Sequence, residues 1–160
     1  MTRVAFRLRP VPGGAPWPVM TVLTELFEQG AVRVDRPHAV GAGRGAPLIH
    51  RQALRWRGVE IHLCAERHGG VDEISLELPP WDELVEQIDD EDDLWTLIDS
   101  VAATCDAQHG AIGDGEPLED DPLDPRRHVG LIVVERDSGA VPLAAPYTVL
   151  PRSGLCVLLR

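Results

Sequence analysis

The first nine residues alternate between apolar and polar positions. Val4, Phe6 and Leu8 share one phase, and the other phase is rich in arginine. A period of two is typical of a strand that is buried on one face. The pattern therefore predicts a half-buried strand that shows Arg3, Arg7 and Arg9 to water.

Apolar positions then recur at helical spacing over residues 17–29. Pro18 stands near the start of this segment and Gly30 just past its end, positions that suit the two ends of a helix. The predicted apolar stripe of this first helix consists of Val19, Val22, Leu23, Leu26 and Phe27.

A short strand and a loop follow. Val32 and Val34 alternate with polar residues, which predicts the strand. Residues 41–47 resemble a phosphate-binding loop in their glycine content alone. The G-K-[ST] ending is missing, and Pro47 stands where a helix would have to begin. We therefore expect an ordinary loop.

Two tight turns are predicted farther along the chain. Trp56 ends one apolar phase and Val59 begins the opposite phase, so residues 57–58 must form a turn or a bulge. The glycines after His68 predict a hairpin turn, and residues 74–78 then alternate as a strand. Such a short connection implies antiparallel pairing.

Two apolar stripes at helical spacing follow a pair of prolines. The first stripe covers residues 81–88. An acidic run separates it from the second, which begins at Leu94, includes Cys105 and is predicted to continue to about His109. A glycine-containing turn at residues 113–115 ends this helical part.

The C-terminal part holds two predicted strands. Residues 129–134 are a continuous apolar run, typical of a central strand, and residues 155–159 are expected to form a closing strand. Residues 142–151, with Tyr147, form either a loop over the core or an arm that reaches a partner.

This order of elements predicts an α+β fold, with an antiparallel or mixed β-sheet and two to three helices packed on one face. A chain of 160 residues with 44% hydrophobic content can bury one core without disulfides or metals. We expect a single domain over residues 1–160, with an exposed acidic loop at about residues 113–127.

Charge is distributed very unevenly along the chain. Residues 81–125 hold sixteen acidic residues and neither Lys nor Arg, which accounts for the net charge of -11. Residues 1–80 hold ten arginines against eight acids, and residues 126–160 hold five arginines against two acids. A concentrated anionic surface steers cationic partners toward it and repels nucleic acid and anionic lipid.

Part of this acidity has a structural explanation, because carboxylates favour the first turn of a helix. The remainder repel one another, so the surface is either a binding face or a solvated exterior. Trp95 neighbours Leu94, and adjacent helical residues are not expected both to point fully inward, which would place a tryptophan within the acidic face as an interface anchor. The favoured alternative is that Trp81 and Trp95 are both ordinary core residues. The predicted partner-binding residues are Trp81, Asp82, Glu86, Asp89, Asp90, Glu91, Asp92, Asp93 and Trp95.

The cysteines and histidines do not predict a metal or catalytic site. A Cys2His2 zinc set could combine Cys105 and His109, on one helix face, with residues 62–68. Strand alternation, however, turns His62 and Cys64 away from the helices, whereas Cys105 continues the core stripe. An apolar, acidic setting also disfavours the thiolate that a cysteine nucleophile requires. We expect no cofactor and name no catalytic residue.

Two further groups of charged residues could each form a binding site, and each also has a simpler explanation. Carboxylates between residues 114 and 121 could gather around a divalent cation, but their spacing is not that of an EF-hand loop. Arginines on the polar phase of the strands could receive nucleic acid, or they could pair with glutamates on neighbouring strands. The candidate pairing partners are Glu60, Glu66, Glu73 and Glu77.

Composition also suggests where the protein works. The first twenty residues contain no signal-peptide core, and no later apolar run has the length of a membrane helix. Three widely spaced cysteines suit a reducing compartment. All fifteen basic residues are arginine, which suggests a GC-rich coding genome. We expect a bacterial, cytoplasmic protein.

The leading functional hypothesis is a non-enzymatic module that docks its acidic surface on a basic protein. Its most concrete form is an immunity or antitoxin-type inhibitor of a toxin or nuclease, without direct binding to nucleic acid or membrane. One alternative is a small enzyme or ligand-binding domain with a cleft near His109 and His128. Another is an acidic subunit of a larger bacterial assembly. The oligomeric state is left open.

Overall fold

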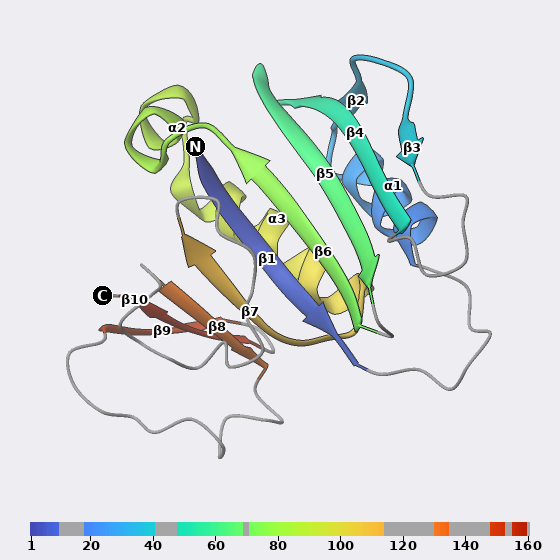
Figure 1. Cartoon of the computed structure of the whole chain (residues 1–160). Coiled ribbons are helices and arrows are strands. Elements are labelled where there is room, and N and C mark those ends of the chain that lie inside the picture. Colours follow the sequence, from blue (N-terminus) through green and yellow to red (C-terminus); the bar gives the residue numbers. More distant parts are fainter. Residues whose placement is uncertain are drawn as a thin grey trace.

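The computed structural model describes residues 1–9, 18–40, 48–68, 71–113, 130–134, 148–152 and 155–159. Its strands form one antiparallel sheet, and its helices make the fold α+β, as predicted (Figure 1). Along the chain the elements are β1 (Thr2–Leu8), α1 (Val19–Glu28), β2 (Val32–Arg33), β3 (His38–Val40), β4 (Leu48–Trp56), β5 (Val59–His68), β6 (Val71–Leu78), α2 (Trp81–Gln87), α3 (Glu91–Thr104), β7 (Ala107–Gly113), β8 (Gly130–Val134), β9 (Thr148–Arg152) and β10 (Leu155–Leu159).

The strand order places the N-terminal strand in the interior of the sheet. The order is β2, β4, β5, β6, β1, β7, β8, β10, β9, and β3 also pairs with β4. Helices α1 and α3 lie together on one face of the sheet, behind it in Figure 1. One apolar core joins the inward side chains of α1, α2 and α3 to those of β1, β4, β5, β6 and β7. We call the face away from the helices the second face.

The prediction that β1 shows its arginines to water is wrong. The strand itself is present, and Val4 and Phe6 lie in the core as expected. Because β6 and β7 flank β1, however, Arg3 lies deep within the second face and is only 8% exposed. The alternation identified the strand, but the position of a strand within its sheet is decided by the other segments that pair with it.

The predicted turn at residues 57–58 is confirmed. Trp56 and Val59 face each other at the end of the β4–β5 hairpin, and the two residues between them have positive φ, 49° at Arg57 and 83° at Gly58. Two positive φ values are the requirement of the tight hairpin turn that matches the twist of the strands. The glycines predicted to turn the chain after His68 lie outside the described residues, but the predicted antiparallel pairing is confirmed, with His68 of β5 opposite Val71 of β6.

The first helix and the short strand after it are also confirmed, as α1 and β2. The sequence did not predict β3, whose three residues pair with the start of β4. Between β2 and β3, the Asp35 carboxylate takes the place of a strand partner and accepts a hydrogen bond from the Ala53 N–H at 3.2 Å. The predicted glycine-rich loop at residues 41–47 lies outside the described residues.

The predicted continuation of the last helix to His109 is wrong. Helix α3 ends at Thr104, and Asp106 adopts a left-handed conformation with φ of 51°. Aspartate tolerates this conformation better than most residues do, so it lets the chain reverse direction. His109 therefore belongs to β7, where it pairs with Arg7 of β1.

The C-terminal strands agree in part with the prediction. Strand β8 lies between β7 and β10, which confirms a central strand. Residues 148–152 form β9 beside β10, so this portion of the predicted loop or arm is a strand. Tyr147, His128 and the acidic loop beyond Gly113 lie outside the described residues.

Candidate docking surface

Helices α2 and α3 are anchored to the core by one side and expose carboxylates on the other. Leu84 and Ile88 of the first helical segment are buried, as are Leu94, Leu97 and Ile98 of the second. Exposed acidic residues occupy the remaining positions of α2, its connection to α3, and the first turn of α3. We define the acidic helix surface as Asp82, Glu83, Glu86, Asp89, Asp90, Glu91, Asp92 and Asp93.

Three of these carboxylates have local structural roles. Asp90 caps α3 by accepting the Asp92 N–H at 2.9 Å, and Glu91 accepts the indole N–H of Trp95 at 3.1 Å. Asp93 forms an ion pair with Arg57, 2.8 Å from Oδ2 to Nη1. These contacts confirm that part of the acidity stabilises the start of the helix.

Three other carboxylates of the acidic helix surface have no cation near them among the described residues. Within the described part of the chain, no arginine or histidine lies within salt-bridge distance of Asp82, Glu86 or Asp89. Arg57 is the described cation that reaches this surface, and its guanidinium also lies over the Trp56 ring at 5.5 Å. The acidic helix surface is thus exposed and strongly anionic, and the helices that carry it are anchored in the core.

The two tryptophans of the predicted surface have different environments. Trp95 is only 1% exposed and Leu94 beside it is fully buried, so both point inward, which the sequence analysis considered incompatible. This is feasible because α2 covers the start of α3, with the Trp81 and Trp95 ring centroids 5.4 Å apart. Trp81 is half-buried and is the tryptophan of this pair with an accessible edge.

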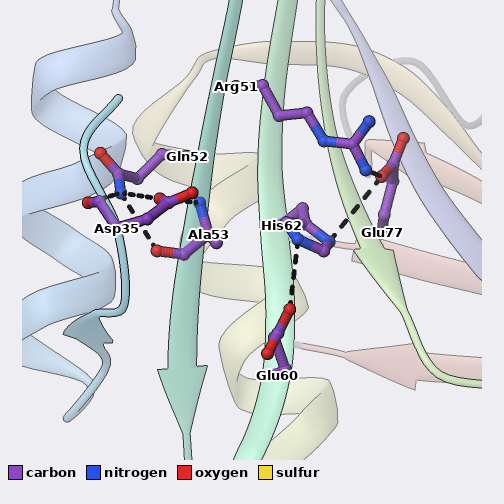
Figure 2. Close-up of polar contacts among 7 residues, drawn as sticks. All are labelled: Asp35, Arg51, Gln52, Ala53, Glu60, His62 and Glu77. Atoms are coloured by element: carbon purple, nitrogen blue, oxygen red, sulfur yellow. Dashed lines mark hydrogen bonds and ion pairs between the residues drawn. The ribbon is translucent and has the colours of Figure 1, made fainter. Parts of the chain in front are cut away.

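The second face of the sheet carries charge pairs rather than a free basic surface. Arg51 donates a hydrogen bond to Glu77 at 2.5 Å, and Arg3 donates one to Glu73 at 2.6 Å (Figure 2 shows the former). His62 lies between two carboxylates, 3.5 Å from Glu60 and 3.9 Å from Glu77. This cross-strand pairing is the alternative to nucleic-acid binding that the alternation of charges allowed.

Cys64 and Cys105 lie on opposite faces of the sheet. Cys64 is buried within the second face and Cys105 within the helix side of the core, as strand alternation and the apolar stripe predicted. Burial raises the pKa of each thiol to about 12. The described residues contain no cluster of three or more metal-binding side chains. The placement of Cys105 and His109 on one helix face was wrong, because His109 is in β7.

A second charged feature was not recognised in the sequence. Arg33 and Arg55 are both exposed where β2 meets β4, at the edge of the sheet, but on opposite faces: Arg33 lies over the Phe27 ring of α1, and Arg55 lies opposite Val32. The sequence placed Arg33 and Arg55 on the polar phase of strands. What it could not give was that no described carboxylate lies within salt-bridge distance of either one, because that depends on which side chains lie opposite.

Comparison with protein-family models, with curated proteins and with solved structures finds no match to this chain. Among the described helices, none has the length and apolar character needed to cross a bilayer.

Proposed function

We propose that this protein is a non-enzymatic binding module whose acidic helix surface docks on a basic partner protein. The observation that carries the proposal is the group of exposed carboxylates at Asp82, Glu86 and Asp89, for which the described part of the chain supplies no cation. Mutual repulsion among them costs folding stability. A cationic partner would offset that cost.

The base of the surface suits rapid capture without rearrangement. Leu84 and Leu94 are fully buried and fix both helices, so the carboxylates are held in place before a partner arrives. Complementary charge accelerates encounter, whereas a few partly apolar contacts prolong the life of a complex. The accessible edge of Trp81, next to Asp82, would provide such a contact.

The most concrete form of this function is an immunity or antitoxin-type inhibitor. A toxin that cuts nucleic acid needs a positively charged active site, and a preorganised anionic surface is complementary to that site. The inhibitor would cover the site and exclude the substrate. Burial of Cys64 and Cys105 agrees with a protein that acts by binding rather than by the chemistry of these cysteines.

The test uses two variants of equal charge change. One carries Asp82→Asn, Glu86→Gln and Asp89→Asn, which avoid the capping, tryptophan-bonded and arginine-paired carboxylates. The control carries Glu28→Gln, Glu60→Gln and Glu66→Gln on other elements. Proteins retained from host lysate on immobilised wild type would be identified, purified and titrated against all three proteins.

We expect a basic protein that binds the wild type and the control tightly and the acidic-surface variant at least about tenfold more weakly, with affinity falling as salt rises. Inhibition of that protein's own activity would establish the inhibitor role. Equal binding by all three proteins, or no basic partner at all, would reject the proposal and leave solubility as the role of the charge.

A further inference from the structure

A guanidinium group already lies on the acidic helix surface, and it comes from the chain itself. Arg57, in the turn between β4 and β5, places Nη1 2.8 Å from Oδ2 of Asp93 in the first turn of α3. The Cζ atom of Arg57 lies over the ring of Trp56, 5.5 Å from the ring centroid. A carboxylate and an aromatic ring thus bind this guanidinium together. We call Trp56 and Asp93 the guanidinium site.

The backbone conformation at Arg57 is not one that arginine favours. Its φ of 49° is left-handed, and Gly58 after it has a φ of 83°. Hairpin turns with two positive φ values favour Asn, Asp or Gly at these positions, and a long side chain such as arginine is strained there. Strain at a non-glycine residue is more frequent where the side chain has a functional role.

The ion pair of Arg57 contributes little to the stability of the fold. The side chains of Arg57 and Asp93 are 48% and 34% exposed, so water screens their attraction, and both lose conformational freedom when they pair. In the buried pair of Arg3 and Glu73, by contrast, about one tenth of each side chain is exposed. The contact of Arg57 can therefore open at small cost, and a cation from another molecule can reach Asp93.

Trp56 makes the site selective for one kind of cation. Its indole N–H donates to the Gln29 carbonyl at 3.1 Å, and the residue is only 2% exposed while Arg57 lies over it. Departure of the Arg57 side chain uncovers part of the ring, which is unfavourable unless another group covers it. A planar guanidinium can cover an indole ring and donate to a carboxylate at once, whereas the compact, strongly hydrated ammonium of lysine is less suited to both.

We propose that Arg57 is an internal competitor for the acidic helix surface, and that an arginine side chain of the basic partner displaces it to bind between Trp56 and Asp93. The inference rests on the proposed function and names the residue type by which the partner is recognised. While Arg57 is bound, the apparent affinity for a partner is reduced by the fraction of molecules in which the site is occupied. The contact therefore disfavours weakly held cations and admits an arginine that further contacts hold in place.

The test variant is Arg57→Asn, which removes the guanidinium and suits the left-handed backbone, so that the turn is kept. Arg55→Gln is the matched control. Arg55 is exposed on the adjoining strand, no described carboxylate lies within salt-bridge distance of it, and its loss changes the net charge equally. A double variant adds Asp93→Asn to Arg57→Asn. Circular dichroism would verify that every variant is folded.

The probes are two fluorescein-labelled peptides that differ only in their cations. One carries arginines separated by Gly-Ser pairs, and the other carries lysine at the same positions. Fluorescence anisotropy at low ionic strength measures the affinity of each peptide. The NMR signal of the Trp56 indole N–H, assigned with Trp56→Phe, reports whether the peptide contacts the ring itself.

We expect the wild type to bind the arginine peptide more tightly than the lysine peptide. Arg57→Asn should bind the arginine peptide about fivefold more tightly than the wild type does, because an exposed ion pair with a cation–π contact keeps the site occupied in most molecules. Arg55→Gln should stay within about twofold of the wild type. Adding Asp93→Asn should remove the gain. The Trp56 signal of Arg57→Asn should shift with the arginine peptide and not with the lysine peptide.

No gain with Arg57→Asn, or an equal gain with Arg55→Gln, would overturn the proposal, since net charge would then be sufficient. A gain that survives Asp93→Asn, equal gains for the two peptides, or an unmoved Trp56 signal would also overturn it. Failure of the proposed function gives a different result. The variant with Asp82→Asn, Glu86→Gln and Asp89→Asn would then bind the arginine peptide as tightly as the wild type.

Discussion

Arg3 and Glu73 form an ion pair inside the second face of the sheet, with Nη2 and Oε1 only 2.6 Å apart and about one tenth of each side chain exposed. The two residues lie on neighbouring strands, four positions out of direct register, since Arg3 pairs with Glu77 and Glu73 with Arg7. Glu66 approaches the same guanidinium from β5 at 3.8 Å. Buried charges of this kind depend on each other, since either one left alone would be desolvated without compensation.

Removing one partner of this pair should therefore cost more than removing both. We expect Arg3→Met to lower the free energy of unfolding by about 3–5 kcal/mol, and the double variant Arg3→Met, Glu73→Leu to recover most of that loss. Urea denaturation of the single and double variants measures both values. If the double variant were as unstable as the sum of the single variants, the pair would carry no coupling and its burial would be incidental.

Asp35 should be essential to the far edge of the sheet although it is exposed. Its main-chain and side-chain oxygens both accept hydrogen bonds from Gln52 Nε2, at 2.8 and 3.1 Å, and Gln52 is fully buried. Asp35→Ala leaves the Gln52 amide and the Ala53 N–H short of an acceptor. We expect a loss of about 1–3 kcal/mol in unfolding free energy, measured by urea denaturation.

Asp35→Asn is the matched control for this prediction, because it keeps an oxygen acceptor at the same position and removes only the charge. The Asp35→Asn variant should retain most of the wild-type free energy of unfolding. The amides where β2 pairs with β4 should exchange hydrogen as they do in the wild type, faster than those of the core. Equal losses from both substitutions would mean that the charge, rather than the hydrogen bonds, is what the edge requires.

The buried thiols predict an alkaline limit to stability. Burial raises the pKa of Cys105 from 9.0 to about 12, so between these values the unfolded chain loses a proton that the folded chain keeps. Stability is then complete below pH 9 and falls as the pH rises, by about 1.4 kcal/mol per pH unit for one such thiol. The sequence contains no lysine and one tyrosine, so few other groups obscure the effect.

Denaturation at several pH values between 8 and 11 tests this expectation. Cys105→Ala should remove one thiol's contribution to the decrease of unfolding free energy with pH. Cys64→Ala should have the same effect, since the pKa of Cys64 is also raised to about 12. Both thiols should react with a thiol reagent only after unfolding. Rapid modification of either one in the folded protein would contradict the burial on which the prediction rests.

The lowered pKa of His50 predicts that the free energy of unfolding also decreases at acidic pH. Burial, and then the charge of Arg33, lower its pKa below 6.5, so the unfolded chain takes up a proton before the folded chain does. Its contribution to stability is present above pH 6.5 and is lost as the pH falls toward the folded-state pKa. His50→Gln should remove this part of the acid sensitivity, measured as the difference from the wild type in urea denaturation.

Arg33→Gln provides a second measurement on the same group. With the guanidinium replaced, the His50 pKa followed by NMR titration should rise toward 6.5, and burial alone should keep it below that value. An unchanged titration would show that the positive charge of Arg33 does not reach His50.

Local pattern was sufficient for most elements of the fold. The 3.6-residue period of α1 and the phase reversal at residues 57–58 depend on neighbours in sequence, and each appeared where predicted. The α+β class followed from their order. Short pieces such as β3 carry too few residues for a period, and they exist because a longer partner strand, β4, supplies the hydrogen bonds.

The end of α3 shows where local pattern fails. The apolar stripe through Cys105 continues smoothly toward His109, so no local signal marks the change from helix to strand except Asp106. The helix ends because residues 107–113 gain more as the seventh strand, paired with β1, than as another helical turn. That competition involves residues a hundred positions away.

The sequence by itself determined the charge of this protein, the existence of its amphipathic elements and the concentration of acid in α2 and α3, because these properties belong to single residues and short periods. Tertiary structure alone decided which charges are compensated. It buried Arg3 against Glu73, paired Arg57 with Asp93, turned Asp35 inward and placed Arg33 over the Phe27 ring, with no described carboxylate within salt-bridge distance. Pairing depends on distances across strands, and only the folded chain fixes those distances.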